Sequence, residues 1–100
     1  MSNQFYHDLF LNYCINNNKR KIKKLMQKRP IDIRYYLKGM KFCIVLQNNN
    51  LLEWLYSRKG EIFRMDTNLF GDFITFAYIY QNYYIANWLV NQYKDFNKDF

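Results

Sequence analysis

Residues 13–26 read YCINNNKRKIKKLM, and two later stretches repeat their pattern. Residues 42–55 read FCIVLQNNNLLEWL, and residues 76–89 read FAYIYQNYYIANWL. In each stretch an aromatic residue and then a small one (Cys14, Cys43 or Ala77) precede a short polar segment. Large apolar residues follow at intervals of three and four, which is the spacing of one helix face and not of a strand. The three stretches therefore predict a helical hairpin that is repeated three times.

The apolar positions predict three pairs of helices, at about 6–16 and 19–28, 36–47 and 51–58, and 69–81 and 83–93. Asn can close the turns between paired helices, because it tolerates left-handed backbone angles and caps helices. Three Gly and one Pro would be a poor supply for the turns of an all-β fold. We therefore expect an all-α chain that forms a single domain over residues 1–100, with repeats at about 5–34, 35–63 and 69–97.

Each unit also carries an acid followed by an apolar residue. These pairs are Asp32-Ile33, Glu61-Ile62 and Asp95-Phe96. The order of elements over residues 5–97 resembles the ankyrin repeat, in which such a segment enters a finger-like hairpin. It is similar to the divergent ankyrin repeats that are abundant in giant viruses of amoebae. The resemblance implies a short α-solenoid of three ankyrin-like hairpins that binds proteins without catalysis.

The sequence departs from the ankyrin pattern in three ways. No T-P-L-H opens a helix, the turn Gly is missing, and the spacing between units differs from the family period of 33 residues. The first finger is expected to shrink to a bare turn between Pro30 and Tyr36. A different antiparallel helical repeat, or a small bundle, is the alternative fold.

The composition indicates a source and a compartment. Asn, Lys, Tyr, Phe and Ile make up 51 of the 100 residues, and A/T-dominated codons encode them. We infer an AT-rich genome, as in large viruses, amoebae or parasites, and a viral protein in the host cytoplasm or the virion, with the nucleus as an alternative. Two Cys in one small-residue column fit a reducing, intracellular compartment. Because the longest apolar run is about five residues, we expect no membrane span.

Few residues could carry catalysis or bind a cofactor. His7 is the only histidine, and the sequence shows no nucleophile for it to activate. Cys14 and Cys43 are expected to fill small core positions and to stay unbridged. With eight acids and two Cys in the chain, zinc sites have little to use. We expect no enzyme, no metal and no cofactor.

The charge is concentrated in one segment. Seven of the eleven residues from Lys19 to Arg29 are basic, while the second half of the chain carries a net charge of −1. A solvated helix face is the simplest interpretation, and an anion-binding or partner-binding surface is the functional one. The candidate residues are Lys19, Arg20, Lys21, Lys23, Lys24 and Lys28. Without a base-reading motif, nucleic-acid binding by this segment would be weak and phosphate-based.

Aromatic residues crowd the last repeat. Trp54 and Trp88 stand at corresponding positions and are expected to pack in the core. Four tyrosines are too many to bury in a three-repeat stack and are predicted to form a protein interface, including one between copies of the chain. They are Tyr78, Tyr80, Tyr83 and Tyr84. The leading hypothesis is a protein-interaction module with a host or self partner, and the alternative is a small basic nucleic-acid-associated protein.

Overall fold

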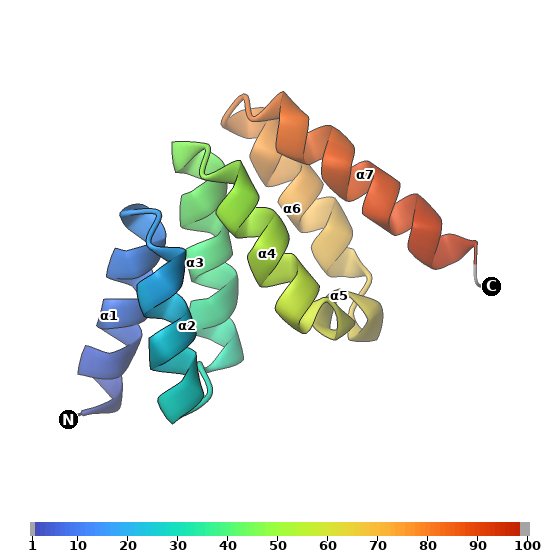
Figure 1. Ribbon diagram of the computed structural model, residues 1–100. Helices are drawn as coiled ribbons and strands as arrows, with labels where there is room; N and C mark the ends of the chain where they lie inside the picture. Colours follow the sequence, from blue (N-terminus) through green and yellow to red (C-terminus); the bar gives the residue numbers. More distant parts are fainter. Residues whose placement is uncertain (1, 99–100) are drawn as a thin grey trace. The chain divides into compact units, whose positions relative to one another are not determined.

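The computed structural model describes residues 2–98, which are all-α as expected. All six predicted helices form, and a short seventh helix, α5, is added (Figure 1). The helices are α1 (Asn3–Ile15), α2 (Lys19–Lys28), α3 (Ile33–Leu46), α4 (Asn49–Lys59), α5 (Glu61–Met65), α6 (Asn68–Ile79) and α7 (Tyr83–Asn97).

The chain divides into two compact units, and the division falls within α4. Unit 1 ends at Leu52, and unit 2 begins at Glu53. In unit 1, α1 packs against both α2 and α3, and in unit 2, α6 packs against α5 and α7. Each unit contains one pair of antiparallel helices joined by a short turn, α1 with α2 and α6 with α7 (Figure 1).

Three turns, between α1 and α2, α3 and α4, and α6 and α7, share one backbone geometry. Each contains a residue in the left-handed region: Asn17 (φ 55°), Gln47 (φ 59°) and Gln81 (φ 61°). The expectation that Asn supplies this conformation is confirmed at Asn17 and wrong at the other two turns, where Gln adopts it. A left-handed residue just after a helix allows the last carbonyls of that helix to be capped.

The next residue in each of these turns is an asparagine that serves both helices. The backbone N–H groups of Asn18, Asn48 and Asn82 donate to carbonyls five residues earlier, at 2.8–2.9 Å, which closes the first helix. The side chains of Asn18 and Asn82 then accept from backbone N–H groups in the first turn of the second helix. Asn48 instead donates its side-chain amide to the carbonyl of Cys14 at 2.9 Å.

The three turns align the hairpins so that Asn18, Asn48 and Asn82 correspond, and we call this alignment the turn frame. It differs by one residue from the alignment that pairs Cys14 with Cys43. Counted from the turns, Tyr13 corresponds to Cys43 and Ala77. In the second helices the corresponding positions are Ile22, Leu52 and Ala86, all fully buried. By burial, Cys14 matches Cys43 and Ala77 as expected, because all three are fully buried, whereas Tyr13 is only half-buried.

The predicted finger-like hairpins are wrong for the described residues. Residues 61–65 form α5, residues 94–97 complete α7, and residues 2–98 contain no strand. Glu61 lies in the first turn of α5, where a carboxylate favours the helix because the N-terminus is partly positive. Only the first connection is as short as expected, since four residues, 29–32, separate α2 from α3.

The core of unit 1 depends on the close approach of α1 and α3. A Cβ atom on Gly39 would lie 2.5 Å from Cε2 of Phe10 and 2.8 Å from Sγ of Cys14, so only Gly fits there. Tyr6 joins α1 to the end of α2, because its buried hydroxyl lies 2.5 Å from the carbonyl oxygen of Leu25. The hydroxyl also contacts the carbonyl of Arg29.

The core of unit 2 is aromatic. Phe63 of α5 lies with its ring 5.1 Å from the rings of Phe70 and Phe73 in α6, and all three are fully buried. Tyr56 of α4 packs edge-on against Trp88 of α7, with ring centroids 5.1 Å apart. Such tilted and edge-on contacts are favoured geometries for aromatic pairs.

Candidate functional site

Helix α2 buries a narrow stripe and exposes its cations. Ile22 and Leu25 are buried and Met26 is half-buried, close to the expected inward face. With about 100° between successive residues, the cations fall on two flanks of this stripe. Lys21, Lys24 and Lys28 lie on one flank, which we call the hollow-side lysines. The far-side cations are Lys19, Arg20 and Lys23 on the other flank. All six candidate side chains are exposed.

The hollow-side lysines line a depression between α1 and α2. It has a volume of about 250 Å³, and its other lining residues are Tyr13 and Leu25. A second hollow of about 290 Å³ shares Tyr13, Leu25 and Lys28, so the two hollows adjoin each other. Nζ of Lys21 lies 5.6 Å from the centroid of the Tyr13 ring.

Arg29 and Tyr6 extend this surface at the end of α2. The guanidinium carbon of Arg29 lies 4.2 Å from the centroid of the Tyr6 ring, a cation–π contact. An Arg29 N–H also donates to Oδ1 of Asn3 at 3.0 Å. Burial raises the pKa of Tyr6, while Arg29 acts in the opposite direction. Both Tyr6 and Tyr13 escaped the sequence reasoning, because their place beside the lysines follows only from the packing of α1 on α2.

In the turn frame, the other two hairpins carry apolar residues at the positions of Lys21 and Lys24. Lys21 corresponds to Leu51 and Ile85, which are buried. Lys24 corresponds to Trp54 and Trp88, which are half-buried. The first hairpin therefore presents ammonium groups and an aromatic ring where the other two hairpins present apolar side chains.

The four tyrosines of the last hairpin are exposed, as predicted. Their exposed fractions are 48% for Tyr78 and Tyr80, 55% for Tyr83 and 57% for Tyr84, and Ile79 between them is 68% exposed. We call these five residues the tyrosine cluster. The rings of Tyr78 and Tyr83 lie 5.9 Å apart across the α6–α7 turn, so the two helices present one surface.

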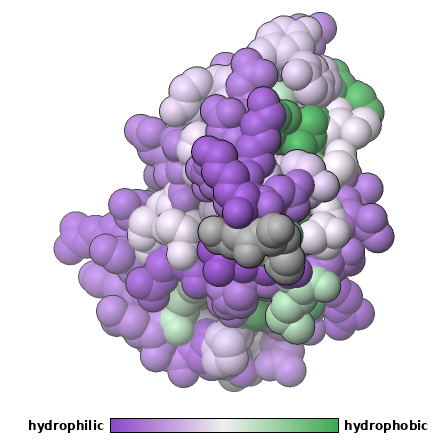
Figure 2. Space-filling model, turned by 90° about the vertical axis from the view of Figure 1, so that its right-hand side faces the viewer, coloured by the Kyte–Doolittle hydropathy of each residue, from purple (hydrophilic) through white to green (hydrophobic). Residues whose placement is uncertain are grey.

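Polar contacts hold part of the tyrosine cluster in place. The hydroxyl of Tyr84 donates to Oε2 of Glu53 at 3.5 Å, and the ring of Tyr80 lies 4.6 Å from that of Phe76. On the face seen in Figure 2, strongly apolar side chains form only small areas among hydrophilic ones.

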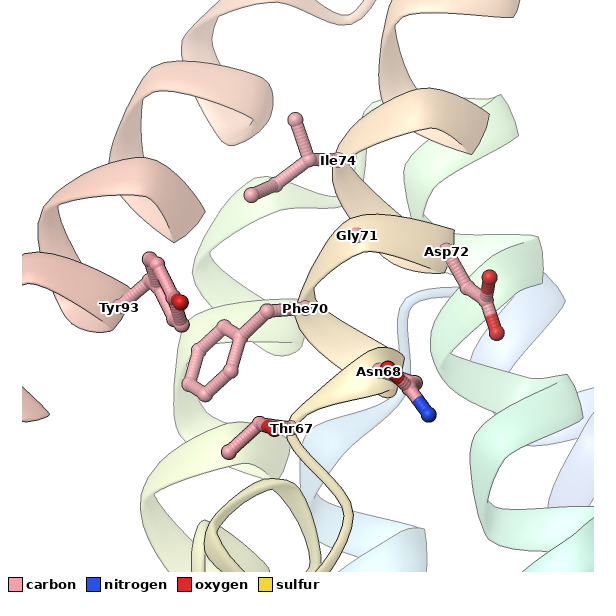
Figure 3. A pocket seen from close by; sticks show the side chains of 7 residues that line it. All are labelled: Thr67, Asn68, Phe70, Gly71, Asp72, Ile74 and Tyr93. Carbon is pink, nitrogen blue, oxygen red and sulfur yellow. The ribbon is translucent and has the colours of Figure 1, made fainter.

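A separate hollow lies between the start of α6 and Tyr93 of α7 (Figure 3). Its volume is about 530 Å³, and the ring of Tyr93 lies 5.3 Å from that of Phe70. Figure 3 shows Phe70 and Tyr93 facing each other while Asn68 and Asp72 point elsewhere. Because its polar groups do not converge, this hollow lacks the arrangement typical of a small-molecule site.

His7 has a structural partner. Its Nε2 accepts a hydrogen bond from the backbone N–H of Asp32 at 3.2 Å, and its ring stacks on Tyr35 at 4.3 Å. The imidazole thus holds the start of α3 against α1. Among residues 2–98, no three His, Cys, Asp or Glu side chains are grouped closely enough to hold a metal ion.

The two cysteines are free and fully buried in unit 1. The thiol of Cys43 points toward the carbonyl of Cys14, with 4.0 Å between sulfur and oxygen. Hydrogen bonding to Cys43, and then burial, raise the pKa of the Cys14 thiol far above its ordinary value. A protonated, buried thiol is a poor nucleophile, so Cys14 acts as a core residue.

The expectation that both tryptophans belong to the core is met only in part. Trp54 and Trp88 are half-buried, and the guanidinium of Arg58 lies 5.5 Å from the Trp54 ring. Within the described part of the chain, no helix is both long and apolar enough to cross a bilayer. No protein-family model, curated protein or solved structure matches the chain, so the ankyrin resemblance stays a prediction.

Proposed function

We propose that the chain is a non-catalytic protein-interaction module, built as a short α-solenoid of three ankyrin-like helical hairpins. Three turns of one geometry, each followed by an asparagine, support a repeated hairpin. Because residues 2–98 contain no finger hairpin, the proposed repeat departs from the ankyrin pattern and has helical or very short connections instead. Solenoids of stacked hairpins present extended surfaces that bind proteins.

The tyrosine cluster is the observation that carries this proposal. At about 200 Å² per aromatic side chain, four half-exposed tyrosines leave roughly 400 Å² of aromatic surface. Summed over the four side chains, this area is similar in size to the largest apolar patches on monomers, which are often functional. Tyr is also among the residues enriched at protein interfaces, because its ring is apolar and its hydroxyl can still bond water or a partner.

A second copy of the chain is the partner with which the proposal can be tested first. We expect the molar mass from light scattering to rise with protein concentration and the double substitution Tyr83→Ser, Tyr84→Ser to keep the chain monomeric. Phe5→Ser is the control, because Phe5 is 52% exposed in unit 1, outside the cluster. It should leave the association unchanged. A mass that stays monomeric up to millimolar concentration contradicts self-association through this surface.

The second candidate function is that of a small nucleic-acid-associated protein. The lysine-lined hollow of α1 and α2 favours it, since it joins three cations to an aromatic ring. The two candidates use different units of the molecule and can therefore be tested separately.

A further inference from the structure

The hollow between α1 and α2 combines positive charge with a half-buried aromatic ring, that of Tyr13. Its lining residues are Tyr13, Lys21, Lys24, Leu25 and Lys28. The helix rises about 1.5 Å per residue, so the hollow-side lysines are distributed over roughly 10 Å along α2. This length is comparable to the Debye length at about 0.1 M salt, and the three cations therefore act together on a ligand.

No carboxylate lines this hollow. The described part of unit 1 contains two acids, and each has another partner. Asp8 accepts a hydrogen bond from the Gln4 amide at 2.8 Å, and Asp32 pairs with Arg34 at 3.2 Å. Helix α2 itself has no acid, so no i,i+4 carboxylate within the helix neutralises the hollow-side lysines.

We propose that this hollow binds single-stranded nucleic acid, with phosphates on Lys21, Lys24 and Lys28 and a base stacked on Tyr13. The site goes beyond the protein-interaction function, because it lies in unit 1 and uses none of the tyrosine cluster. A positively charged groove beside an aromatic ring is the combination that binds single strands without sequence preference.

The Tyr13 ring favours this ligand over other anions. In an acidic peptide or a lipid surface, the unit that bears the anion would use the lysines but carries no flat ring to stack on Tyr13. A nucleotide brings both a phosphate and a base within one short unit. Because the turn frame places Tyr13 where Cys43 and Ala77 are fully buried, the first hairpin is the only one of the three with a ring at this position.

The role of the lysines is tested with two variants, each of which removes three positive charges from one flank of α2. Binding of a fluorescent 12-nucleotide oligo(dT) is followed by fluorescence anisotropy between about 20 and 200 mM salt. With three phosphate contacts, log K should fall with log salt at a slope of about −2. The triple substitution of the hollow-side lysines by Gln should weaken binding at low salt at least tenfold and flatten the slope.

The far-side cations are the matched control. Replacing Lys19, Arg20 and Lys23 by Gln removes the same charge from the same helix, and we expect a loss of no more than about threefold. Equal losses in the two triple variants would mean that net charge alone attracts the strand, and would overturn the proposed site. Circular dichroism on each variant checks that α2 is still formed.

Tyr13 is tested by separating its ring from its hydroxyl. Tyr13→Phe should bind oligo(dT) as the parent does, while Tyr13→Leu should lose roughly 5- to 150-fold, the range for one stacked base. Inorganic polyphosphate has no base, so its affinity should be the same for Tyr13→Leu and the parent. If Tyr13→Leu binds oligo(dT) like the parent, the hollow is a general anion site and the proposal fails.

Two competing ligands complete the test. Poly-glutamate represents an acidic protein segment, and phosphatidylserine vesicles represent an anionic membrane. Both should bind at least tenfold more weakly than oligo(dT), when compared per negative charge. Stronger binding of either one would overturn the assignment to nucleic acid.

Discussion

The first and last hairpins share a backbone turn and differ in the chemistry of the second helix. In both, a left-handed residue and an asparagine end one helix and begin the next. Three and six residues after this asparagine, α2 has Lys21 and Lys24, while α7 has Ile85 and Trp88. The same backbone thus presents ammonium groups in unit 1 and apolar side chains in unit 2.

Neighbouring elements explain this difference. Ile85 is fully buried, and Trp88 meets the edge of Tyr56 in α4. The corresponding flank of α2 faces water beside Tyr13, so charged side chains cost nothing there. The turn therefore sets where a helix begins, whereas the elements that cover one flank of the helix set which residues that flank tolerates.

The largest effect should come from emptying either core. Phe10→Ala in unit 1 and Phe63→Ala in unit 2 each remove a fully buried ring. Each should lower the free energy of unfolding by about 3–5 kcal/mol, measured by urea denaturation. Phe5→Ala, at an exposed position, should change it by less than about 0.5 kcal/mol. A small cost at only one of the two buried sites would mean that the units are not equally well packed.

The two helical glycines should respond in opposite directions. Gly39→Ala places a methyl group against Phe10 and Cys14 and should cost about 1–3 kcal/mol of unfolding free energy. Gly71→Ala meets no atom within 4 Å and should stabilise α6 by up to about 1 kcal/mol. The denaturant midpoints of the two variants, each compared with that of the parent chain, measure these effects. A neutral Gly39→Ala would contradict the close packing of α1 on α3.

The capping asparagines should differ by their burial. Asn82→Ala removes an almost fully buried N-cap of α7 and should cost about 1–2 kcal/mol. Asn18→Ala removes the same bond at the start of α2, where water can replace it, and should cost about 0.5–1 kcal/mol. Thermal unfolding of both variants gives the ranking. The reverse order would show that α2 depends on its cap more than α7 does.

The smallest effect concerns acid stability in unit 1. Hydrogen bonds from the side chain and then the backbone N–H of Arg34 lower the pKa of Asp32 below its ordinary value of 3.8. The unfolded chain therefore binds this proton more readily, and the stabilisation, present above about pH 4, is lost as the pH falls. In Arg34→Gln the drop in the urea midpoint from pH 6 to pH 3 should be smaller than in the parent. An equal drop in both would show that the pair does not contribute.

The sequence alone predicted the six long helices and their approximate ends, because apolar spacing and asparagine-rich turns are local signals. It also predicted that the tyrosines of the last hairpin are exposed and that α2 turns its cations outward. The finger-like hairpins were wrong, since α5 and the end of α7 are helical where the acid–apolar pairs suggested turns. Phe63 of α5 packs on Phe70 of α6, and a short sequence motif does not report such a contact between helices.

The register of the first hairpin was decided by tertiary structure. Both Tyr13 and Cys14 fit the repeated pattern as sequence, and a single residue separates the two frames. The packing of α1 chooses between them, since Cys14 is fully buried against Gly39 of α3 while Tyr13 lines the hollow beside α2. Local spacing therefore determined that these helices form. Only packing decided that Tyr13 lies beside Lys21, Lys24 and Lys28. The reason is that neighbouring helices cover some faces of a helix and leave others exposed to water.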